Sequence, residues 1–374
     1  MAAGTKKIKG ERSHLGIWVV RSMVVVALAA YWFIQTGVMT GAVSLGLFWA
    51  IMVLGVYITY RILDIADLTV EGSITLGASV AARLITEGVD PYLATLAAIG
   101  TGLVAGLITG LLHTKLRIPA LLAGILTLTG LYSVNLMVMD RPNIPLLPNK
   151  VSSVFTPLTS LGLDTNMAAL AVGAICVVAM GAILYWFFGT ELGSAIRATG
   201  SNPAMVRAQG INTSRMIILG LMISNGLVGF AGALIAQYQT FSDISMGIGS
   251  IVIGLASLII GEVLFGTRSF KNALIAVACG AVIYRIIIAA VIGLGLPANN
   301  LKLFVAITVT LALALPVMQQ YGNTVVRSFR RPDFGADFDA GTGADGAGAG
   351  VDATLAPGQR HAGQWRSKFR RKGR

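Results

Sequence analysis

The sequence predicts an all-α integral membrane protein with about ten transmembrane helices. Of its 374 residues, 55% are hydrophobic and only 12% are charged, and the mean hydropathy is +0.77. A soluble domain needs a more strongly charged surface than this composition provides. The apolar residues also fall in blocks of roughly 18 to 25 residues, the length that a helix needs to cross a hydrocarbon core of about 30 Å.

Ten such blocks follow one another along the chain. We expect spans at residues 16–38, 42–62, 69–86, 92–113, 118–139, 166–188, 214–237, 246–266, 270–292 and 299–318. Lys6, Lys7 and Lys9 before the first block are also typical of the start of a secretory signal. Arg21 interrupts that block, and no small-residue cleavage site precedes a soluble domain, so we interpret it as a membrane anchor.

The basic residues predict the orientation of the chain, because Lys and Arg gather in cytoplasmic loops. If both termini are cytoplasmic, the inner segments and their edges hold most of the 28 basic residues. The net charge of +12 follows from this sidedness and does not indicate a nucleic-acid partner. We expect residues 319–374 to be a disordered, basic cytoplasmic tail, because they have little apolar bulk, and their last basic residues suit anionic lipid head groups.

The sequence offers no pattern for catalysis or for a metal. Cys176 and Cys279 lie in apolar blocks, and the three His residues are scattered over unrelated segments. No phosphate-binding GxxxxGK[ST] motif occurs. We therefore expect neither an enzyme nor a cofactor on this chain, and any ATP and Mg²⁺ would bind to a partner.

The segment 189–213, between the sixth and seventh blocks, predicts two short helices. The first would run from Glu191 to Thr199 and end at Gly200 in a left-handed conformation. Ser201 or Asn202 would cap the second helix. We expect such a structured loop to be a docking element, since a few residues suffice to join two spans.

Further residues of this loop fit the same prediction. Pro203 suits the first position of the second helix, Gly210 its end, and Asn212 the cap of the following span. Arg197 and Arg207 offer positive charge to an acidic groove of a partner. The alternative is a surface helix that lies at the lipid interface.

The string LGSAIRATGSNPAMVRAQGIN in this loop resembles the coupling loop of branched-chain-amino-acid-type permeases of bacterial ABC importers. Further strings resemble one subgroup of largely unassigned substrate, some of it linked to aromatic amino acids. These strings are DLTVEGSITLGASVAA, HTKLRIPALLAGILTLTGLYSVNL, RPNIPLL, LIIGEVLFG and LPANNLKLFVA. The resemblance covers roughly Gly41 to Pro316, so the first 40 residues and the tail fall outside it.

The resemblance implies a type II-like importer permease in the bacterial plasma (inner) membrane. Its partners would be an ABC ATPase subunit, an extracytoplasmic substrate-binding protein and a second permease subunit, identical or different. The chain would divide into a cytoplasmic N-terminus with an extra span (1–40), a permease domain (41–318) and the tail (319–374). The loop would seat in a cleft of the ATPase through Gly193, Ala195, Arg197, Ala198, Gly200, Asn202, Pro203, Arg207 and Gly210.

Charged and polar groups inside the spans are candidates for a translocation path or gate. Charges there are costly and need a reason. Asp67 and Glu71 suit either a substrate site or a helix N-terminus, and we expect Arg285 to pair with Glu262 or Glu71. The polar candidates, which can equally form hydrogen bonds between helices, are Asn225, Gln237 and Asn300.

Alternating access driven by a separate ATPase, with an amino acid as the favoured solute, is the leading interpretation. An ion-coupled secondary transporter is the alternative, but it would need midplane ion ligands and often an internal repeat, and it leaves the docking loop unexplained. A membrane enzyme lacks paired acidic motifs or a nucleophile with its base. An ABC exporter would usually carry a fused ATPase. The glycines at 102, 106 and 110 and at 226, 229 and 232 predict close helix packing.

Overall fold

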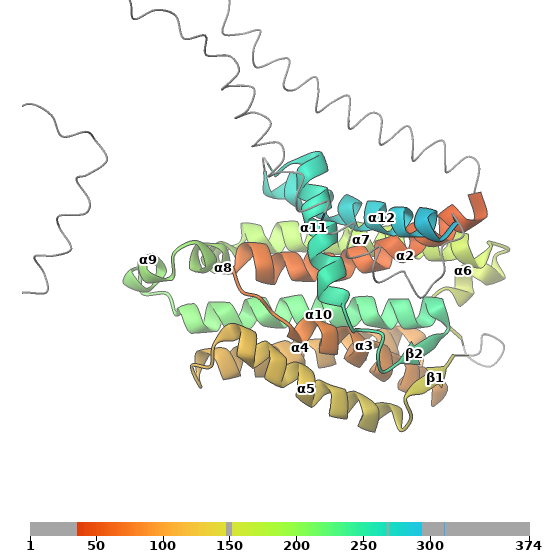
Figure 1. The fold of residues 1–374 in the computed structure, drawn as a ribbon, viewed down its shortest axis with the longest axis horizontal. Helices are drawn as coiled ribbons and strands as arrows, with labels where there is room; N and C mark the ends of the chain where they lie inside the picture. The colour runs from red at the N-terminus through yellow and green to blue at the C-terminus, as the bar shows by residue number, and fades with distance from the viewer. Residues whose placement is uncertain (1–35, 147–151, 268, 294–309, 311–374) are drawn as a thin grey trace, which may run out of the picture. The chain divides into compact units, whose positions relative to one another are not determined.

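The computed structural model describes residues 36–146, 152–267, 269–293 and 310. Within them the chain is a bundle of helices with two short strands (Figure 1). The predicted span 299–318 except residue 310, most of 16–38, Asn300 and the tail lie outside these residues.

The elements are bounded as follows. The long helices are α2 (Thr36–Tyr57), α3 (Thr69–Thr86), α4 (Pro91–Thr114), α5 (Ala120–Met139), α7 (Thr165–Gly189), α10 (Thr213–Gln239), α11 (Ser250–Phe265) and α12 (Phe270–Gly293). The short elements are the π-helix η1 (Ile58–Ile62), which continues α2, the helices α6 (Thr156–Ser160), α8 (Glu191–Ser201) and α9 (Pro203–Ala208), and the antiparallel strands β1 (Asn143–Pro145) and β2 (Phe241–Asp243).

Six of the described helices are long and apolar enough to cross a membrane. They are Met39–Ile62, Pro91–Thr114, Ala120–Met139, Thr165–Gly189, Thr213–Gln239 and Phe270–Gly293. Each matches a predicted span within a few residues. α3 and α11, which match two further predicted spans, are too polar or too short to count among the six.

α10 lies in the middle of the bundle (Figure 1). It packs against α3 and α4 on one side and α2 on the other, and α2 in turn contacts α7 and α12. The glycines of α4 allow its close approach to α10, because a Cβ at Gly102 or Gly106 would collide with the carbonyl oxygen of Asn225 or Leu221. The predicted role of these glycines in close packing is confirmed.

α3 is less apolar than the spans because protein surrounds it. Thirteen of its eighteen residues are buried, including Ser73, Thr75 and Ser79. Thr75 and Ser79 each donate a hydrogen bond to a carbonyl of the preceding helical turn. Hydroxyl groups are tolerated here because their hydrogen bonds are satisfied inside the helix.

α11 begins four residues later than its predicted span. The chain leaves β2, runs through turns from Ile244 to Gly249 and becomes helical at Ser250. Gly249 has φ +82°, which interrupts a helix, and a Cβ at Gly247 would collide with the carbonyl oxygen of Glu71. The close contact with α3 therefore replaces the first turn of the predicted span.

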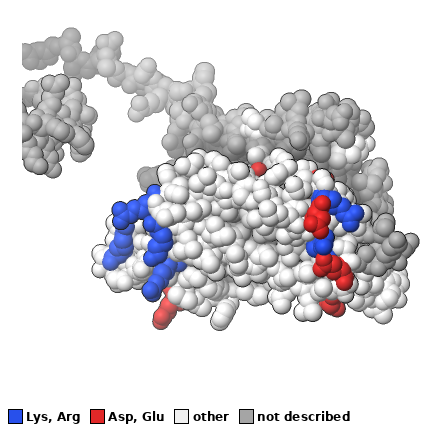
Figure 2. Space-filling model, turned by 90° about the horizontal axis from the view of Figure 1, so that it is seen from below, with Lys and Arg blue, Asp and Glu red and all other residues white. Residues whose placement is uncertain are grey.

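Charged side chains gather at the two ends of the bundle, with a broad band almost free of charge between them on the face shown in Figure 2. The end at α8 and α9 carries Arg197, Arg207 and Arg215. The opposite end carries Arg83, which forms ion pairs with Glu87 and Asp140. This distribution suits helices that cross an apolar layer.

Candidate functional site

The loop between α7 and α10 folds as two capped helices. Thr190 Oγ1 accepts the N–H of Gly193 at 3.3 Å, and Asn202 Oδ1 accepts the N–H of Met205 at 3.1 Å. Pro203 occupies the first turn of α9, and Gly210 follows its end with φ +83°. The predicted helical hairpin is confirmed, and so is the capping of α10 by Asn212, which accepts the N–H of Arg215.

The predicted end of α8 at Gly200 is wrong. The helix continues to Ser201, and Gly200 is not among the glycines with positive φ. Its requirement for glycine has another cause: a Cβ at Gly200 would collide with the carbonyl oxygen of Ile62. Gly200 therefore lets α8 press against the end of η1.

α8 is attached to the bundle at two further points. Ile196 is fully buried, and the guanidinium of Arg197 lies 5.0 Å from the centre of the Phe270 ring at the start of α12. The opposite surface of the hairpin is free, because Leu192, Met205 and Arg207 are exposed. The hairpin thus has one face on α12 and η1 and one mixed apolar and basic face that is open to a partner.

A cavity of about 470 Å³ lies where η1, α8, α11 and α12 meet. Arg61 of η1 and Glu262 of α11 form an ion pair of 3.1 Å at its wall, and Arg197 also lines it. This places the predicted gate residue Glu262 beside the hairpin. The sequence did not indicate its partner, Arg61, which lies 201 positions earlier in the chain.

Asp67 and Asn225 form a buried polar network. Asp67 accepts the N–H of Thr69 at 2.9 Å and the Nδ2 of Asn225 at 2.8 Å, and the hydroxyl of Ser73 donates to Asn225 Oδ1 at 2.7 Å. Asp67 is 2% exposed and Asn225 is fully buried. Asp67 therefore lies at the N-terminus of α3, as its alternative expects, and Asn225 forms hydrogen bonds between α10 and the α3 segment, as its own alternative expects.

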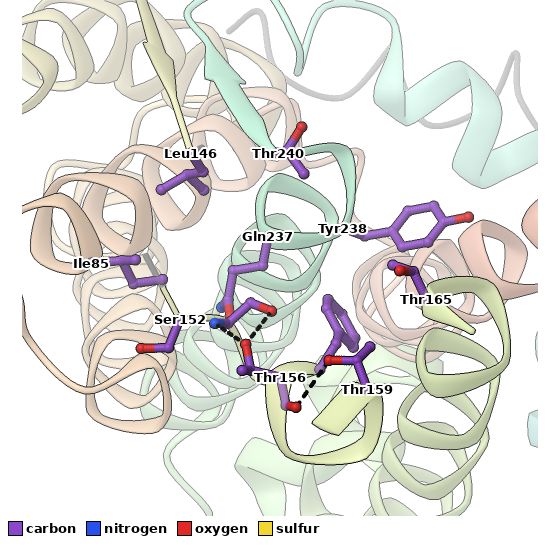
Figure 3. Close-up of a pocket in the computed structure, with 11 residues that line it drawn as sticks. Ile85, Leu146, Ser152, Thr156, Thr159, Thr165, Gln237, Tyr238 and Thr240 are labelled. Atoms are coloured by element: carbon purple, nitrogen blue, oxygen red, sulfur yellow. Dashed lines mark hydrogen bonds between the residues drawn. The ribbon is translucent and has the colours of Figure 1, made fainter. Parts of the chain in front are cut away.

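Gln237 also bridges helices. Its Oε1 accepts the N–H of Val154 and its Nε2 donates to Thr95 Oγ1. It borders a cavity of about 190 Å³ at the β1–β2 end of the bundle, where α6, α7 and α10 converge (Figure 3). Thr156, Thr159 and Tyr238 line the same cavity.

The predicted pairing of Arg285 with Glu262 or Glu71 is wrong. Its guanidinium lies over the ring of Trp49, 4.3 Å from the ring centre. Glu262 pairs with Arg61 instead, and no carboxylate in the described part of the chain lies within ion-pair distance of Arg285. A cation over an aromatic face is stabilised without a carboxylate.

Glu71 lies on a groove of about 370 Å³ between α3, α5 and the turns before α11. Its Oε1 accepts the N–H of Gly249 at 3.0 Å, so the carboxylate holds the start of α11. Asn135 lines the same groove and is 2% exposed; its Nδ2 donates to the carbonyl of Gly72. Asn135 was not among the predicted path residues, although it is the one amide in the predicted span 118–139.

The described residues contain no group of three or more His, Cys, Asp or Glu side chains that could hold a metal ion.

Comparison with known proteins assigns this architecture to a family. Residues 38–314 match the family described as the permease component of the branched-chain amino acid transport system. The chain belongs to this family. It is therefore an ABC-type permease, a multi-pass membrane protein and a transport subunit.

The permease is 43% identical over 279 residues to the tyrosine transport system permease protein of Clostridioides difficile (strain R20291), covering 74% of this chain and 91% of that protein. It is 37% identical over 267 residues to an uncharacterized protein of Rickettsia prowazekii (strain Madrid E), covering 70% of this chain and 92% of that protein. An autoinducer 2 import system permease protein, LsrC of Yersinia pestis (strain Pestoides F), is 29% identical over 213 residues, covering 54% of this chain and 57% of LsrC. No solved structure matches the permease.

Proposed function

We propose that this chain is the membrane subunit of an ATP-driven importer of amino acids in the bacterial inner membrane. The observation that carries the proposal is the doubly capped α8–α9 hairpin, which has one face fixed to the bundle and one face free. A few residues are enough to join two spans, so the connection itself does not require a folded hairpin. A partner protein that binds and moves the hairpin would explain why it is folded.

The contacts of α8 indicate how movement would pass into the membrane. Arg197 rests on Phe270 of α12, and Gly200 rests on Ile62 of η1. Both α12 and η1 border the cavity that contains the Arg61–Glu262 ion pair. A displacement of α8 would therefore change the packing beside this pair, which we interpret as a gate at the cytoplasmic end.

The family supports the choice of partners, and the sequence itself contains no GxxxxGK[ST] nucleotide motif. An ABC ATPase would bind ATP and Mg²⁺ and receive the hairpin, and a second permease subunit would complete the path. An extracytoplasmic binding protein would deliver the solute at the β1–β2 end. Together with the predicted spans 16–38 and 299–318, this orientation would put both termini in the cytoplasm, as the distribution of basic residues predicts.

An amino acid is the solute that the comparisons favour. The Clostridioides difficile relative is named as a tyrosine permease, and the family is described by branched-chain amino acid transport. The same relatives include an importer of autoinducer 2. L-Tyrosine is therefore the first solute to test.

Purification of the tagged chain from its own membranes in mild detergent tests the proposal. The wild type should retain a P-loop ATPase, and Arg207→Glu should lose it because a negative charge would face an acidic groove. Lys115→Glu is the control, since this exposed residue lies at the same end of the bundle but outside the hairpin. Absence of an ATPase from intact wild-type protein would contradict the proposal.

A further inference from the structure

The groove between α3, α5 and the turns before α11 contains a carboxylate that has no cationic partner. Glu71 is half-buried, and among the described side chains no Lys or Arg lies within ion-pair distance of it. A charge inside the apolar layer is costly unless it is compensated. The backbone N–H groups of Gly249 and Ile251, at the start of α11, compensate part of this charge.

A second group in the same groove also lacks a partner. The side-chain oxygen Oδ1 of Asn135 is buried and has no hydrogen-bond donor among the described residues. The amide nitrogen of Asn135 is already used, because it donates to the carbonyl of Gly72. A buried acceptor without a donor costs about 1–3 kcal/mol, so this oxygen is suited to a donor that arrives with a ligand.

The position of the groove fits a path through the membrane. It is lined from α5 by Leu128 and Tyr132, which belong to the middle of that span, and from the other side by Ile244 and Ile248. The turns from Ile244 to Gly249 are not helical. Irregular backbone at membrane depth is tolerated where it is covered by protein or lines a cavity.

We propose that this groove binds the ammonium group of the transported amino acid, with Glu71 and the Oδ1 of Asn135 as its acceptors. The inference rests on the proposed function and deepens it. A primary ammonium group carries three donors and a positive charge, and therefore supplies both the cation that Glu71 lacks and the donor that Asn135 Oδ1 lacks. Leu128, Tyr132 and Ile248 provide an apolar wall for a side chain.

The test compares two ligands that differ only in the ammonium group. The complex of permease and ATPase is placed in lipid nanodiscs without the binding protein, and displacement of radiolabelled L-tyrosine is measured. Unlabelled L-tyrosine carries the ammonium group, and 3-(4-hydroxyphenyl)propanoate is the same molecule without it. The wild type should bind L-tyrosine about tenfold or more tightly than the deaminated acid, the effect of one charge-assisted hydrogen bond.

Glu71→Gln should reduce this preference to within about twofold. The amide oxygen of Gln can still accept the N–H of Gly249, so the start of α11 remains held. Asn135→Ala should weaken the binding of L-tyrosine and leave the binding of the deaminated acid unchanged. Glu87→Gln is the matched control, since Glu87 follows the same helix but lies exposed at its end.

The outcomes separate the inference from the function on which it rests. If the wild type takes up L-tyrosine with ATP in proteoliposomes and Glu71→Gln keeps the full preference for L-tyrosine over the deaminated acid, the ammonium site is contradicted and the importer function is not. If Glu71→Gln loses both binding and thermal stability, Asn135→Ala provides the test. An unchanged preference for L-tyrosine over the deaminated acid in Asn135→Ala also contradicts the site. If the wild type takes up no amino acid with ATP, the proposed function itself fails.

Discussion

The Nδ2 of Asn225 donates a hydrogen bond of 2.8 Å to the carboxylate of Asp67, across 158 positions of the chain. Asp67 lies in the irregular segment between η1 and α3, and Asn225 lies in α10. Both side chains are buried. This bond fixes the start of α3 to the central helix, and α3 carries Glu71 into the groove.

Asn225→Ala should destabilise the protein. It removes a donor from the buried Asp67 and leaves the hydroxyl of Ser73 without its acceptor, at a cost of about 1–3 kcal/mol for each unsatisfied group. The thermal midpoint in detergent should fall clearly below that of the wild type. Asn272→Ala, at an exposed position of α12, should leave it unchanged; equal midpoints for the two variants would refute the structural role of the bond.

Gly106→Ala should separate α4 from α10. The new Cβ would meet the carbonyl oxygen of Leu221, and such overpacking typically costs about 1–3 kcal/mol. Gly100→Ala on the same helix has open space around it and should be neutral or slightly stabilising, because Ala favours helices. Thermal unfolding of both variants measures the difference, and a stable Gly106→Ala protein would contradict the packing.

Gly200→Ala should disturb the contact between α8 and η1, because its Cβ would collide with the carbonyl oxygen of Ile62. We expect ATP-dependent uptake to fall while α8 and α9 remain folded, since their caps are untouched. Gly189→Ala, next to the hairpin but in open space, is the control. Uptake at the wild-type level in Gly200→Ala would show that the contact does not transmit movement.

The ion pair between Arg61 and Glu262 should matter more for transport than for stability. Arg61 is 55% exposed at its side chain, and pairs of this kind contribute about 0.2–1 kcal/mol. Arg61→Glu and Glu262→Arg should each reduce uptake severalfold, because like charges would meet at the gate. The double reversal should restore most of the uptake, and a double variant as inactive as the single ones would argue against the pair.

Local signals predicted much of this fold. The apolar blocks located the six spanning helices, and Asn202 and Pro203 set the start of α9 through a side-chain cap and a fixed φ. Such signals act within a few residues, so a single sequence reveals them. The glycine pattern of α4 likewise predicted close packing, although not the partner helix.

Contacts between distant segments could not be predicted in this way. Position 200 requires glycine because the carbonyl oxygen of Ile62 leaves no room for a Cβ. No residue close to Gly200 in the sequence indicates this contact. The guanidinium of Arg285 lies over the ring of Trp49, although a carboxylate was expected as its partner. The late start of α11 depends on Glu71, 178 positions before Gly249.

Uptake into proteoliposomes tests the central claim most directly. The chain is reconstituted with its co-purified ATPase and binding protein, and the accumulation of labelled L-tyrosine is followed with either ATP and Mg²⁺ or an imposed proton or sodium gradient. We predict accumulation that requires ATP hydrolysis and ignores the ion gradients. Accumulation driven by an ion gradient in the absence of ATP would contradict the account and identify an ion-coupled secondary transporter.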